Sequence, residues 1–251
     1  MGKMDGLVAI VTGASRGLGR AIAKEYAREG AKVVVCARPR SPTGLAGSVE
    51  ETAGGIQAAG GEAFAVACDV ADEAQVSEMV RQVLERYGRI DVLVNNAGIM
   101  VLGESILQIS PAQWDLSIAV NLRGPYLTCR AVLPTMMSQR RGSIVNIGSR
   151  MGSHSIRGGG VLYSASKAGL HMFSRNLADE VREYNIAVNI LRPGALKSEG
   201  SGAIPWTKQD WDQRDEPEVV GPSAVYLALQ DARSFTGNLV LRVDFGKTWG
   251  T

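Results

Sequence analysis

The stretch "LVAIVTGASRGLG", residues 7–19, joins a short apolar run to three closely spaced glycines. Five consecutive apolar residues bounded by a turn signal are typical of a buried β-strand. The following segment "GRAIAKEYAREG" (19–30) carries apolar residues three and four positions apart, which is the spacing of an amphipathic helix. This stretch therefore predicts a strand, a glycine-rich turn and a helix in direct succession.

The same alternation continues along the chain. Apolar runs predict further strands at residues 31–37, 62–68, 90–96, 142–148 and 186–192, with helical patterns between them. In the helix predicted for 48–60, Ser48 and Glu51 have the spacing of a capping box. Near-continuous apolar strands separated by helices are typical of a parallel sheet covered on both faces. The sequence therefore predicts an α/β fold, a doubly wound parallel β-sheet in a single domain spanning residues 1–251.

The bulk composition is that of an ordinary globular protein. The 251 residues are 45% hydrophobic and 21% charged, with a formal net charge of +2. So small a charge excess gives no reason to expect a nucleic acid or a membrane surface as partner. The first residues hold only a five-residue apolar run, so we expect no signal peptide, and no run is long enough to span a bilayer.

Cysteine and histidine usage limits the chemistry further. Cys36, Cys68 and Cys129 are odd in number and lack C-x-x-C spacing, so we expect reduced, buried thiols in a cytoplasmic protein. The two histidines, His154 and His171, form no metal-binding pattern with these cysteines. We therefore expect no metal site.

The glycine-rich turn predicts a ligand. Gly13, Gly17 and Gly19 follow the first strand with the spacing G-x-x-x-G-x-G and open the first helix. Glycines at this junction let backbone N–H groups approach a pyrophosphate at the positive end of a helix. A turn that merely packs the helix closely is the alternative, but the position after the first strand favours a dinucleotide.

The charges near this turn favour one dinucleotide over another. The second predicted strand ends at Ala37, followed by Arg38, where a carboxylate would bind the ribose 2′-hydroxyl of NAD(H). Arg16 lies inside the glycine-rich turn. Two guanidinium groups and no carboxylate suit a 2′-phosphate, so we expect NADP(H) rather than NAD(H). Two solvated surface arginines are the alternative.

Tyr163 and Lys167 in "VLYSASKAGL" (161–170) are four residues apart, so on a helix their side chains share one face. A lysine beside a tyrosine stabilises the phenolate and thereby lowers the tyrosine pKa. A pair of this kind also arises by chance, so its meaning depends on the other motifs.

Seven motifs occur in a fixed order: "TGASRGLG" (12–19), "CDV" (68–70), "NNAG" (95–98), Asn121 in "VNLRG", "IVNIGS" (144–149), "YSASK" (163–167) and "RPGALKS" (192–198). Together they resemble the short-chain dehydrogenase/reductase family over essentially the whole chain. The resemblance implies a Rossmann-like fold and an oxidoreductase dependent on NAD(P). A shared fold does not by itself fix the reaction.

The resemblance also implies site residues by position. Asn121, Ser149, Tyr163 and Lys167 match the catalytic positions of the family. Asp69 and Val70 match residues that flank the adenine, 95–98 lie along the cofactor, and 193–198 line its nicotinamide side. With the glycine-rich turn, the predicted cofactor-binding residues are Gly13, Ser15, Arg16, Gly17, Leu18, Gly19, Arg38, Asp69, Val70, Asn95, Ala97, Gly98, Tyr163, Lys167, Pro193, Gly194 and Ser198.

The sequence departs from the family pattern at three places. Gly148 replaces the first serine of the usual "ISS", which leaves Ser149 at the catalytic position. Ser149 precedes Tyr163 by fourteen residues, one more than is commonest, and the loop between them is rich in glycine. Phe245 stands where the family usually has glycine, so the contacts near the C-terminus are open.

Reduction of a carbonyl needs a hydride on carbon and a proton on oxygen. NADPH would supply the hydride and Tyr163 the proton, as general acid/base. A phenol with a pKa of about 10 needs roughly 4 kcal/mol of preference for its anion to titrate near neutrality. Lys167 and the positive nicotinamide of the oxidised cofactor are the available sources, and Ser149 would orient the substrate oxygen.

Asn121 has a physical reason of its own. Pro125 follows it by four residues, inside a pattern that otherwise predicts one long helix starting at Ser110–Pro111. Proline has no N–H and crowds the carbonyl of the residue four positions earlier. We expect a local helix distortion whose freed Asn121 carbonyl holds a water in a proton relay from Lys167. A proline kink that only fits packing is the alternative.

Two loops are candidates for substrate selection. The first, 150–162, carries His154, which faces either the pocket or solvent. The second, 199–217, carries Trp206 and Trp211 among several acidic residues. It is either a substrate-side lid whose indoles close an apolar pocket, or a short helix that the tryptophans pack onto the body.

Three functions remain open. The leading one is an NADPH-dependent carbonyl reductase or alcohol dehydrogenase for a small-molecule substrate. The second is a 3-oxoacyl-acyl-carrier-protein reductase, with Arg123, Arg130 and Arg175 as candidate docking residues. The third is a cofactor-binding sensor without catalysis, for which the intact Ser149, Tyr163 and Lys167 are not needed. In this family, apolar helices such as 111–138 and 161–184 pair subunits, so the resemblance implies a homotetramer or at least a dimer.

Overall fold

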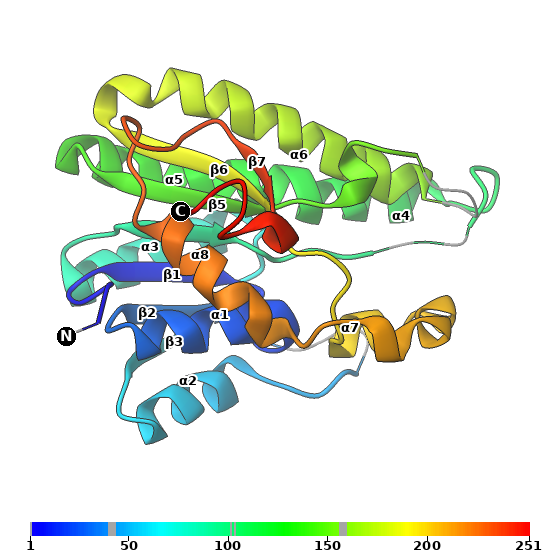
Figure 1. Ribbon diagram of the computed structural model, residues 1–251, viewed down its shortest axis with the longest axis horizontal. Helices are drawn as coiled ribbons and strands as arrows, with labels where there is room; N and C mark the ends of the chain where they lie inside the picture. Colours follow the sequence, from blue (N-terminus) through cyan, green and yellow to red (C-terminus); the bar gives the residue numbers. More distant parts are fainter. Residues whose placement is uncertain (1, 40–43, 101, 103, 156–159) are drawn as a thin grey trace.

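A seven-stranded parallel sheet runs through the middle of the protein (Figure 1). The computed structural model describes residues 2–39, 44–100, 102, 104–155 and 160–251. The strands lie in the order β3-β2-β1-β4-β5-β6-β7, and every neighbouring pair is parallel. Their bounds are β1 Val8–Thr12, β2 Lys32–Ala37, β3 Glu62–Ala67, β4 Val92–Asn95, β5 Gly142–Ile147, β6 Ile186–Arg192 and β7 Leu239–Leu241.

Helices connect the strands and cover the sheet. The α-helices are α1 Gly17–Arg28, α2 Val49–Ala58, α3 Glu73–Tyr87, α4 Pro111–Ile118, α5 Gly124–Gln139, α6 Val161–Glu180, α7 Glu199–Gly202 and α8 Gly221–Ala228. A π-helical turn, η1 Ala119–Arg123, joins α4 to α5. Short 3₁₀ turns are η2 Arg150–Gly152, η3 Arg182–Tyr184, η4 Pro205–Gln209, η5 Trp211–Gln213, η6 Pro217–Val220 and η7 Arg242–Asp244. No helix of the described residues is long and apolar enough to cross a membrane.

The predicted α/β fold with a doubly wound, Rossmann-like parallel sheet is confirmed. All six predicted strands are present, with ends shifted by no more than two residues. The predicted capping box opens α2, where the Ser48 hydroxyl accepts the Glu51 N–H at 3.1 Å and the Glu51 carboxylate accepts the Ser48 N–H at 3.3 Å. The seventh strand was not predicted, because it has only three residues and only Val240 among them is buried.

Alternating residues of the strands fill two apolar cores. In β2, Val33 and Val35 face one core with side chains of α1, α2 and α8, whereas Val34 and Cys36 face the other with side chains of α3, α5 and α6. Figure 1 shows the same division, with α1, α2 and α8 on one side of the sheet and α5 and α6 on the other. This explains why the strands are continuously apolar, since both faces are covered.

The order of the strands determines where a ligand binds. From β1 the chain winds outward to β2 and β3, then returns to β4 on the other side of β1 and continues to β7. The loops after β1 and β4 therefore leave the sheet in opposite directions at the carboxyl ends of the strands. Open α/β sheets bind their ligands at this switch point.

Candidate active site

The glycine-rich turn after β1 lies at the switch point and has no space for side chains. Gly13 has φ +65°, and a Cβ there would lie 2.8 Å from Ala97 Cα in the loop after β4. A Cβ on Gly19 would overlap the Gly13 carbonyl. Gly17 has φ +52°, and a Cβ there would lie 3.1 Å from Ser198 Cβ. The turn therefore requires glycine at all three predicted positions.

Thr12 and Asn96 hold this turn in place. Thr12 Oγ1 accepts hydrogen bonds from the main-chain N–H groups of Asn96 and Ala97 at 3.0 and 3.1 Å. Asn96 Nδ2 donates to the carbonyls of Thr12 and Gly13 at 2.9 and 3.1 Å. Neither residue was singled out from the sequence, although both lie in the motifs. Their contacts join the loop after β1 to the loop after β4.

The amino end of α1 fits an anionic phosphate. Arg16 is the N-cap residue and makes no side-chain capping bond, and the first turn carries no carboxylate. Leu18 packs against the core, and the Ser15 carbonyl accepts Arg20 Nη2 at 2.6 Å. No carboxylate of the helix itself caps this end, although Glu199 Oε2 of α7 lies 3.5 Å from the place of a Cβ on Gly17. The positive end of the helix dipole favours an anionic ligand there.

The two arginines predicted to select the cofactor lie near the carboxyl ends of β1 and β2. Thr12 pairs with Cys36 in the sheet, so the turn after β1 and Arg38 after β2 lie at the same edge. Arg38 is half-buried, and Arg16 Nη2 donates to the Gly47 carbonyl at 3.3 Å. Residues 40–43, which follow Arg38 in the loop between β2 and α2, lie outside the described residues.

Asp69 and Val70 follow β3 at the same edge of the sheet. Asp69 Oδ1 accepts the Ala71 N–H at 3.0 Å, and the Asp69 N–H donates to Gln75 Oε1 at 3.0 Å. Val70 is buried, and a Cβ on Gly124 would lie 2.9 Å from its Cγ2. The pair is therefore rigidly held where the family pattern predicts the adenine.

Asn95 was predicted to bind the cofactor, but its side chain is buried and bonds other side chains of the protein. Its Nδ2 donates to Asn146 Oδ1 at 2.9 Å, and its Oδ1 accepts Thr128 Oγ1 at 2.6 Å. Asn146 in turn donates to Ser174 Oγ at 2.8 Å. Only the main chain of Asn95 is therefore left to face a ligand.

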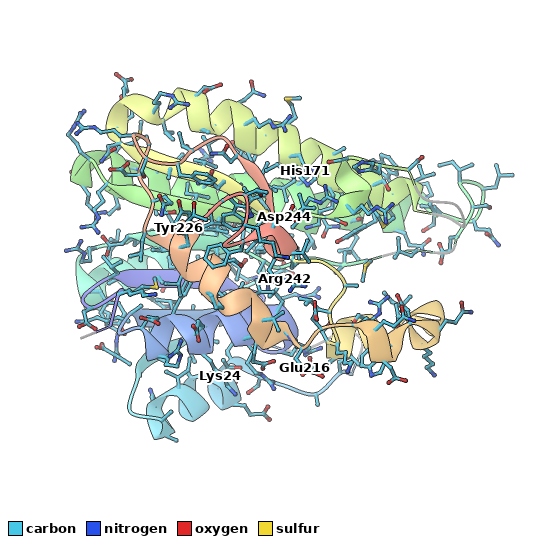
Figure 2. The ribbon with its side chains drawn as sticks, in the orientation of Figure 1. Lys24, His171, Glu216, Tyr226, Arg242 and Asp244 are labelled. Carbon is cyan, nitrogen blue, oxygen red and sulfur yellow. The ribbon has the colours of Figure 1, made fainter. Side chains whose placement is uncertain are left out.

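The loop after β6 meets the glycine-rich turn from the other side. Ser198 caps α7 and accepts the Ser201 N–H at 3.1 Å, and its Cβ lies against Gly17. Gly194 has φ +89°, and Arg242 Nε donates to the Pro193 carbonyl at 3.2 Å. Arg242 also pairs with Asp215, so this side chain joins the C-terminal segment to both ends of the 193–217 region (Figure 2).

Ser149, Tyr163 and Lys167 come together at the carboxyl end of β5. Ser149 follows β5, and Tyr163 and Lys167 lie one turn apart on α6. Ser149 Oγ accepts the Met151 N–H at 3.2 Å, and the Ser149 side chain is near enough to Tyr163 to lower the pKa of the phenol. Lys167 is only 4% exposed, its Nζ donates to the Ile147 carbonyl at 2.8 Å, and it lies 5.8 Å from the centre of the Tyr163 ring.

Burial is the main cause of the pKa shifts of Tyr163 and Lys167. Burial raises the pKa of Tyr163, and the hydrogen bond with Ser149 opposes that rise. Burial lowers the pKa of Lys167 to about 8. Without a ligand the tyrosine is therefore a neutral phenol at neutral pH, and the lysine loses its proton more easily than an exposed one.

The expected helix distortion is present at Asn121. It takes the form of the π-helical turn η1, in which the Gly124 N–H donates to the Ala119 carbonyl. Pro125 has no N–H to offer the Asn121 carbonyl, in agreement with the reason given from the sequence. The Asn121 side chain is fully buried and bonds both main-chain groups of Ile99, accepting its N–H and donating to its C=O at 2.8 Å each.

The 199–217 segment forms short helical turns. The Trp211 indole lies against Gly202 of α7, where a Cβ would be 3.2 Å from its ring, so Trp211 packs the segment on itself. The side chain of Trp206 lies outside the described residues. Lys197 pairs with Glu216 at 3.3 Å, which holds the two ends of the segment together.

His154 and the candidate docking arginines lie on the outside. His154 is exposed, and residues 156–159 of its loop lie outside the described residues. Arg123 Nη1 donates to the Ala71 carbonyl at 2.8 Å, and Arg130 pairs with Glu73 at 2.6 Å, so both are bound to the start of α3. Arg175 is exposed on α6.

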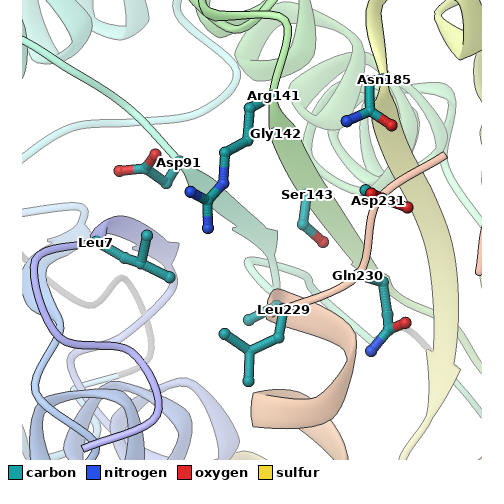
Figure 3. Close-up of a pocket in the computed structure, with 10 residues that line it drawn as sticks. Leu7, Asp91, Arg141, Gly142, Ser143, Asn185, Leu229, Gln230 and Asp231 are labelled. Atoms are coloured by element: carbon teal, nitrogen blue, oxygen red, sulfur yellow. The ribbon is translucent and has the colours of Figure 1, made fainter. Parts of the chain in front are cut away.

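A cavity of about 200 Å³ lies at the other end of the sheet (Figure 3). Leu7, Asp91, Gly142 and Asn185 line it, and they precede or begin β1, β4, β5 and β6 at their amino ends. The cavity is thus separate from the Ser149 cluster. Among the residues that the structure describes, no group of His, Cys, Asp and Glu is arranged to hold a metal ion.

Comparison with known proteins agrees with this geometry. A family model, that of the short chain dehydrogenases, matches residues 7–208. The chain is 34% identical to hydroxysteroid dehydrogenase-like protein 2 of Danio rerio over 99% of its own length, but it spans only 60% of that protein. It is 33% identical to the 3-oxoacyl-acyl-carrier-protein reductase FabG of Thermotoga maritima, covering 95% of this chain and 96% of that protein.

Solved structures share the fold over nearly the full length. A metagenomic short-chain oxidoreductase, solved in complex with NADP, is 38% identical with a TM-score of 0.78, covering 95% of this chain and 97% of that chain. A short-chain type dehydrogenase/reductase of Mycobacterium marinum is 29% identical with a TM-score of 0.85, covering 95% and 94%. On its fold, its sequence match and its relatives, the chain belongs to the short-chain dehydrogenase/reductase family of oxidoreductases.

Proposed function

We propose that this chain is an NADPH-dependent oxidoreductase that transfers a hydride between the nicotinamide and a carbonyl or secondary alcohol, with Tyr163 as the general acid/base. The observation that carries the proposal is the placement of Tyr163 one helical turn from buried Lys167, whose Nζ lies 5.8 Å from the centre of the Tyr163 ring, with Ser149 beside the phenol. This cluster lies at the carboxyl end of the sheet, where the glycine-rich turn offers a phosphate cradle.

The protonation of the cluster suits carbonyl reduction. Burial raises the Tyr163 pKa, so the phenol holds its proton at neutral pH and can donate it to an alkoxide, which is far more basic than a phenolate. Ser149 orients the substrate oxygen through its hydroxyl. When bound, NADPH supplies the hydride. In the oxidative direction, charged Lys167 stabilises the phenolate that the reaction needs.

Asn121 acts on the same proton path through its main chain. Pro125 cannot bond the Asn121 carbonyl, so this carbonyl is the group we assign to a water-linked relay from Lys167 to solvent. The Asn121 side chain is occupied with Ile99, so its role is to hold the 96–99 loop against the helix.

The preference for NADPH rests on charge at the adenine end. Ala37 ends β2 without a carboxylate, and Arg38 and Arg16 lie at the same edge of the sheet. Arginine forks match the geometry of a 2′-phosphate, whereas the ribose 2′-hydroxyl of NADH finds no acid there. Relatives solved in complex with NADP are consistent with this choice.

The test follows nicotinamide absorbance with NADPH and NADH over a panel of ketones, 3-oxoacyl thioesters and alcohols. Tyr163→Phe should lose turnover by about 10²–10⁴-fold while NADPH still binds, because only the proton donor is removed. Arg38→Ala should lower kcat/KM for NADPH and leave that for NADH unchanged. Full turnover of Tyr163→Phe would contradict the proposal, and tight NADPH binding without turnover of any substrate would favour a sensor.

The second candidate is reduction of a 3-oxoacyl thioester, which is favoured by relatives of that name. Two of the three predicted docking arginines, Arg123 and Arg130, are bound to α3, so Arg175 is left as the exposed candidate. Charge reversal by Arg175→Glu should slow turnover of a carrier-protein thioester but not of the same acyl group on a small thiol. Equal rates on both would exclude docking at Arg175.

We also propose that the chain is a single domain that assembles as a homotetramer in the cytoplasm. Exposed apolar side chains gather on the helices expected to pair subunits: Trp114 and Leu116 on α4, Tyr126 on α5, Val161 and Met172 on α6. The three cysteines are free and buried, as expected in a reducing compartment. Light scattering of the purified protein tests the assembly.

A further inference from the structure

His171 lies one helical turn after Lys167 on α6 and is only 5% exposed (Figure 2). Its ring packs against the turn formed by residues 148–153, which carries Ser149. Neither the family pattern nor the proposed chemistry assigns this histidine a role. A buried imidazole beside the proposed active site therefore needs an explanation.

The contacts of the ring define its tautomer. The Ser149 main-chain N–H points at His171 Nε2, with a distance of 3.3 Å between the nitrogens. A backbone N–H can only donate, so Nε2 is the acceptor and the ring proton is on Nδ1. Nδ1 lies 3.3 Å from Ser153 Oγ, which accepts that proton. One neutral imidazole thus bonds both ends of the turn.

Two glycines make room for the ring. A Cβ on Gly148 would lie 2.7 Å from His171 Nε2, and a Cβ on Gly152 would lie 2.8 Å from Nδ1. Gly148 is the position at which this sequence departs from the family's usual serine. The imidazole and Ile190 Cγ2, which a Cβ on Gly148 would meet at 2.6 Å, together fill the space that a serine side chain would need at this position.

The surroundings of the ring favour its neutral form. Burial, Lys167, Arg192 of β6 and Arg175 lower the His171 pKa to about 4, in that order, and a main-chain bond with Gly152 only partly opposes them. A second positive charge one turn from Lys167 would also repel it. The ring is therefore a fixed acceptor and donor at neutral pH.

We propose that His171, as the neutral Nδ1–H tautomer, is a positioning residue that fixes the backbone of Ser149 and thereby aims the Ser149 hydroxyl at Tyr163. The inference rests on the proposed function, because it concerns how Ser149 is held. The turn contains glycines at 148 and 152, whose backbones are free to move, and the imidazole restricts them. Without it, Ser149 would still be present but poorly oriented.

Nitrogen NMR of the ¹⁵N-labelled protein tests the tautomer without any mutation. The chain has two histidines, and His154 is exposed, so His154→Gln identifies the His171 signals. We expect His171 to show a bare Nε2 and a protonated Nδ1 between about pH 5 and 8, where an unperturbed histidine changes charge. A protonated Nε2 anywhere in that range would overturn the proposal.

Turnover of paired variants tests the function of the contact. Gln carries an oxygen at the position of Nε2 and accepts the Ser149 N–H, whereas Leu fills the space without an acceptor. His171→Leu should lower kcat by about 10–100-fold with little change in NADPH affinity, and His171→Gln should recover most of it.

The two proposals fail in different ways. If Ser149→Ala keeps full turnover, the serine has no catalytic role and the proposed function is wrong at that residue. If Ser149→Ala loses turnover but His171→Leu keeps the wild-type kcat, only the positioning role is wrong. Equal losses in His171→Leu and His171→Gln would likewise show that the hydrogen bond is not what matters.

Discussion

Replacement of Asn121 by alanine tests the clamp between the π-helical turn and the loop after β4. The side chain bonds both main-chain groups of Ile99 at 2.8 Å, and it also donates to Ser166 Oγ at 3.1 Å. Each net bond is worth about 1 kcal/mol, and a buried group left without a partner costs about 1–3 kcal/mol more. We therefore expect Asn121→Ala to lower the free energy of unfolding by about 3 kcal/mol.

Urea unfolding at neutral pH measures this loss directly, and calorimetry should show a Tm lower by about 6–12 °C for a chain of this size. Ser117→Ala is the matched control, because Ser117 is equally buried but its hydroxyl, at 3.3 Å, is the most distant of three acceptors around the two hydrogens of Asn121 Nδ2. The control should lose less than about 1 kcal/mol. If Asn121→Ala unfolds within about 0.5 kcal/mol of the wild type, the clamp does not stabilise the loop and the reasoning is wrong.

Three further outcomes are expected. Burial lowers the Lys167 pKa to about 8 in the folded protein. Below pH 8 the buried charge therefore destabilises the fold, and this destabilisation disappears as the pH rises from about 8 to 10.5, the pKa of an unperturbed lysine. Lys167→Met should therefore be inactive but about 2 kcal/mol more stable at pH 7, with the gain vanishing near pH 10.5 in urea titrations. Asp91 accepts the buried Val8 N–H at 2.9 Å and pairs with half-exposed Arg89, so Asp91→Ala should destabilise by about 1–3 kcal/mol in the same assay, with kcat unchanged. Gly19→Ala should weaken NADPH binding by about tenfold or more in calorimetric titrations, since its Cβ would displace the Gly13 carbonyl.

The elements with strong local signals were predictable from the sequence. The strands at 7–11 and 31–37 are apolar throughout because both faces of the sheet are covered, and such runs are visible in any single sequence. The helix distortion after Asn121 was predictable from Pro125, because the missing N–H acts within one helical turn. That Tyr163 and Lys167 share one face of a helix was predictable from their spacing, whereas the functional meaning of the pair depended on the other motifs.

Features that depend on distant contacts were not predictable. The role of His171 depends on a main-chain N–H that is 22 residues away in sequence, so no local pattern announces it. Asn95 and Asn96 are adjacent and chemically identical, yet Asn95, the last residue of β4, bonds Asn146 and Thr128, whereas Asn96, just after the strand, bonds the glycine-rich turn. β7 depends on pairing with β6 rather than on its own three residues.

The π-helical turn η1 also determines which side of α5 faces the sheet. An α-helix advances about 100° per residue, so the additional residue in η1 rotates everything after it by about that angle. Before the turn, α4 packs on α6, and after it α5 packs on α3. The two helices joined by η1 therefore contact different neighbours. Deletion of one residue from 119–123 would restore a continuous α-helix. It would also rotate Thr128 away from Asn95 and break the contact of α5 with the sheet that it covers.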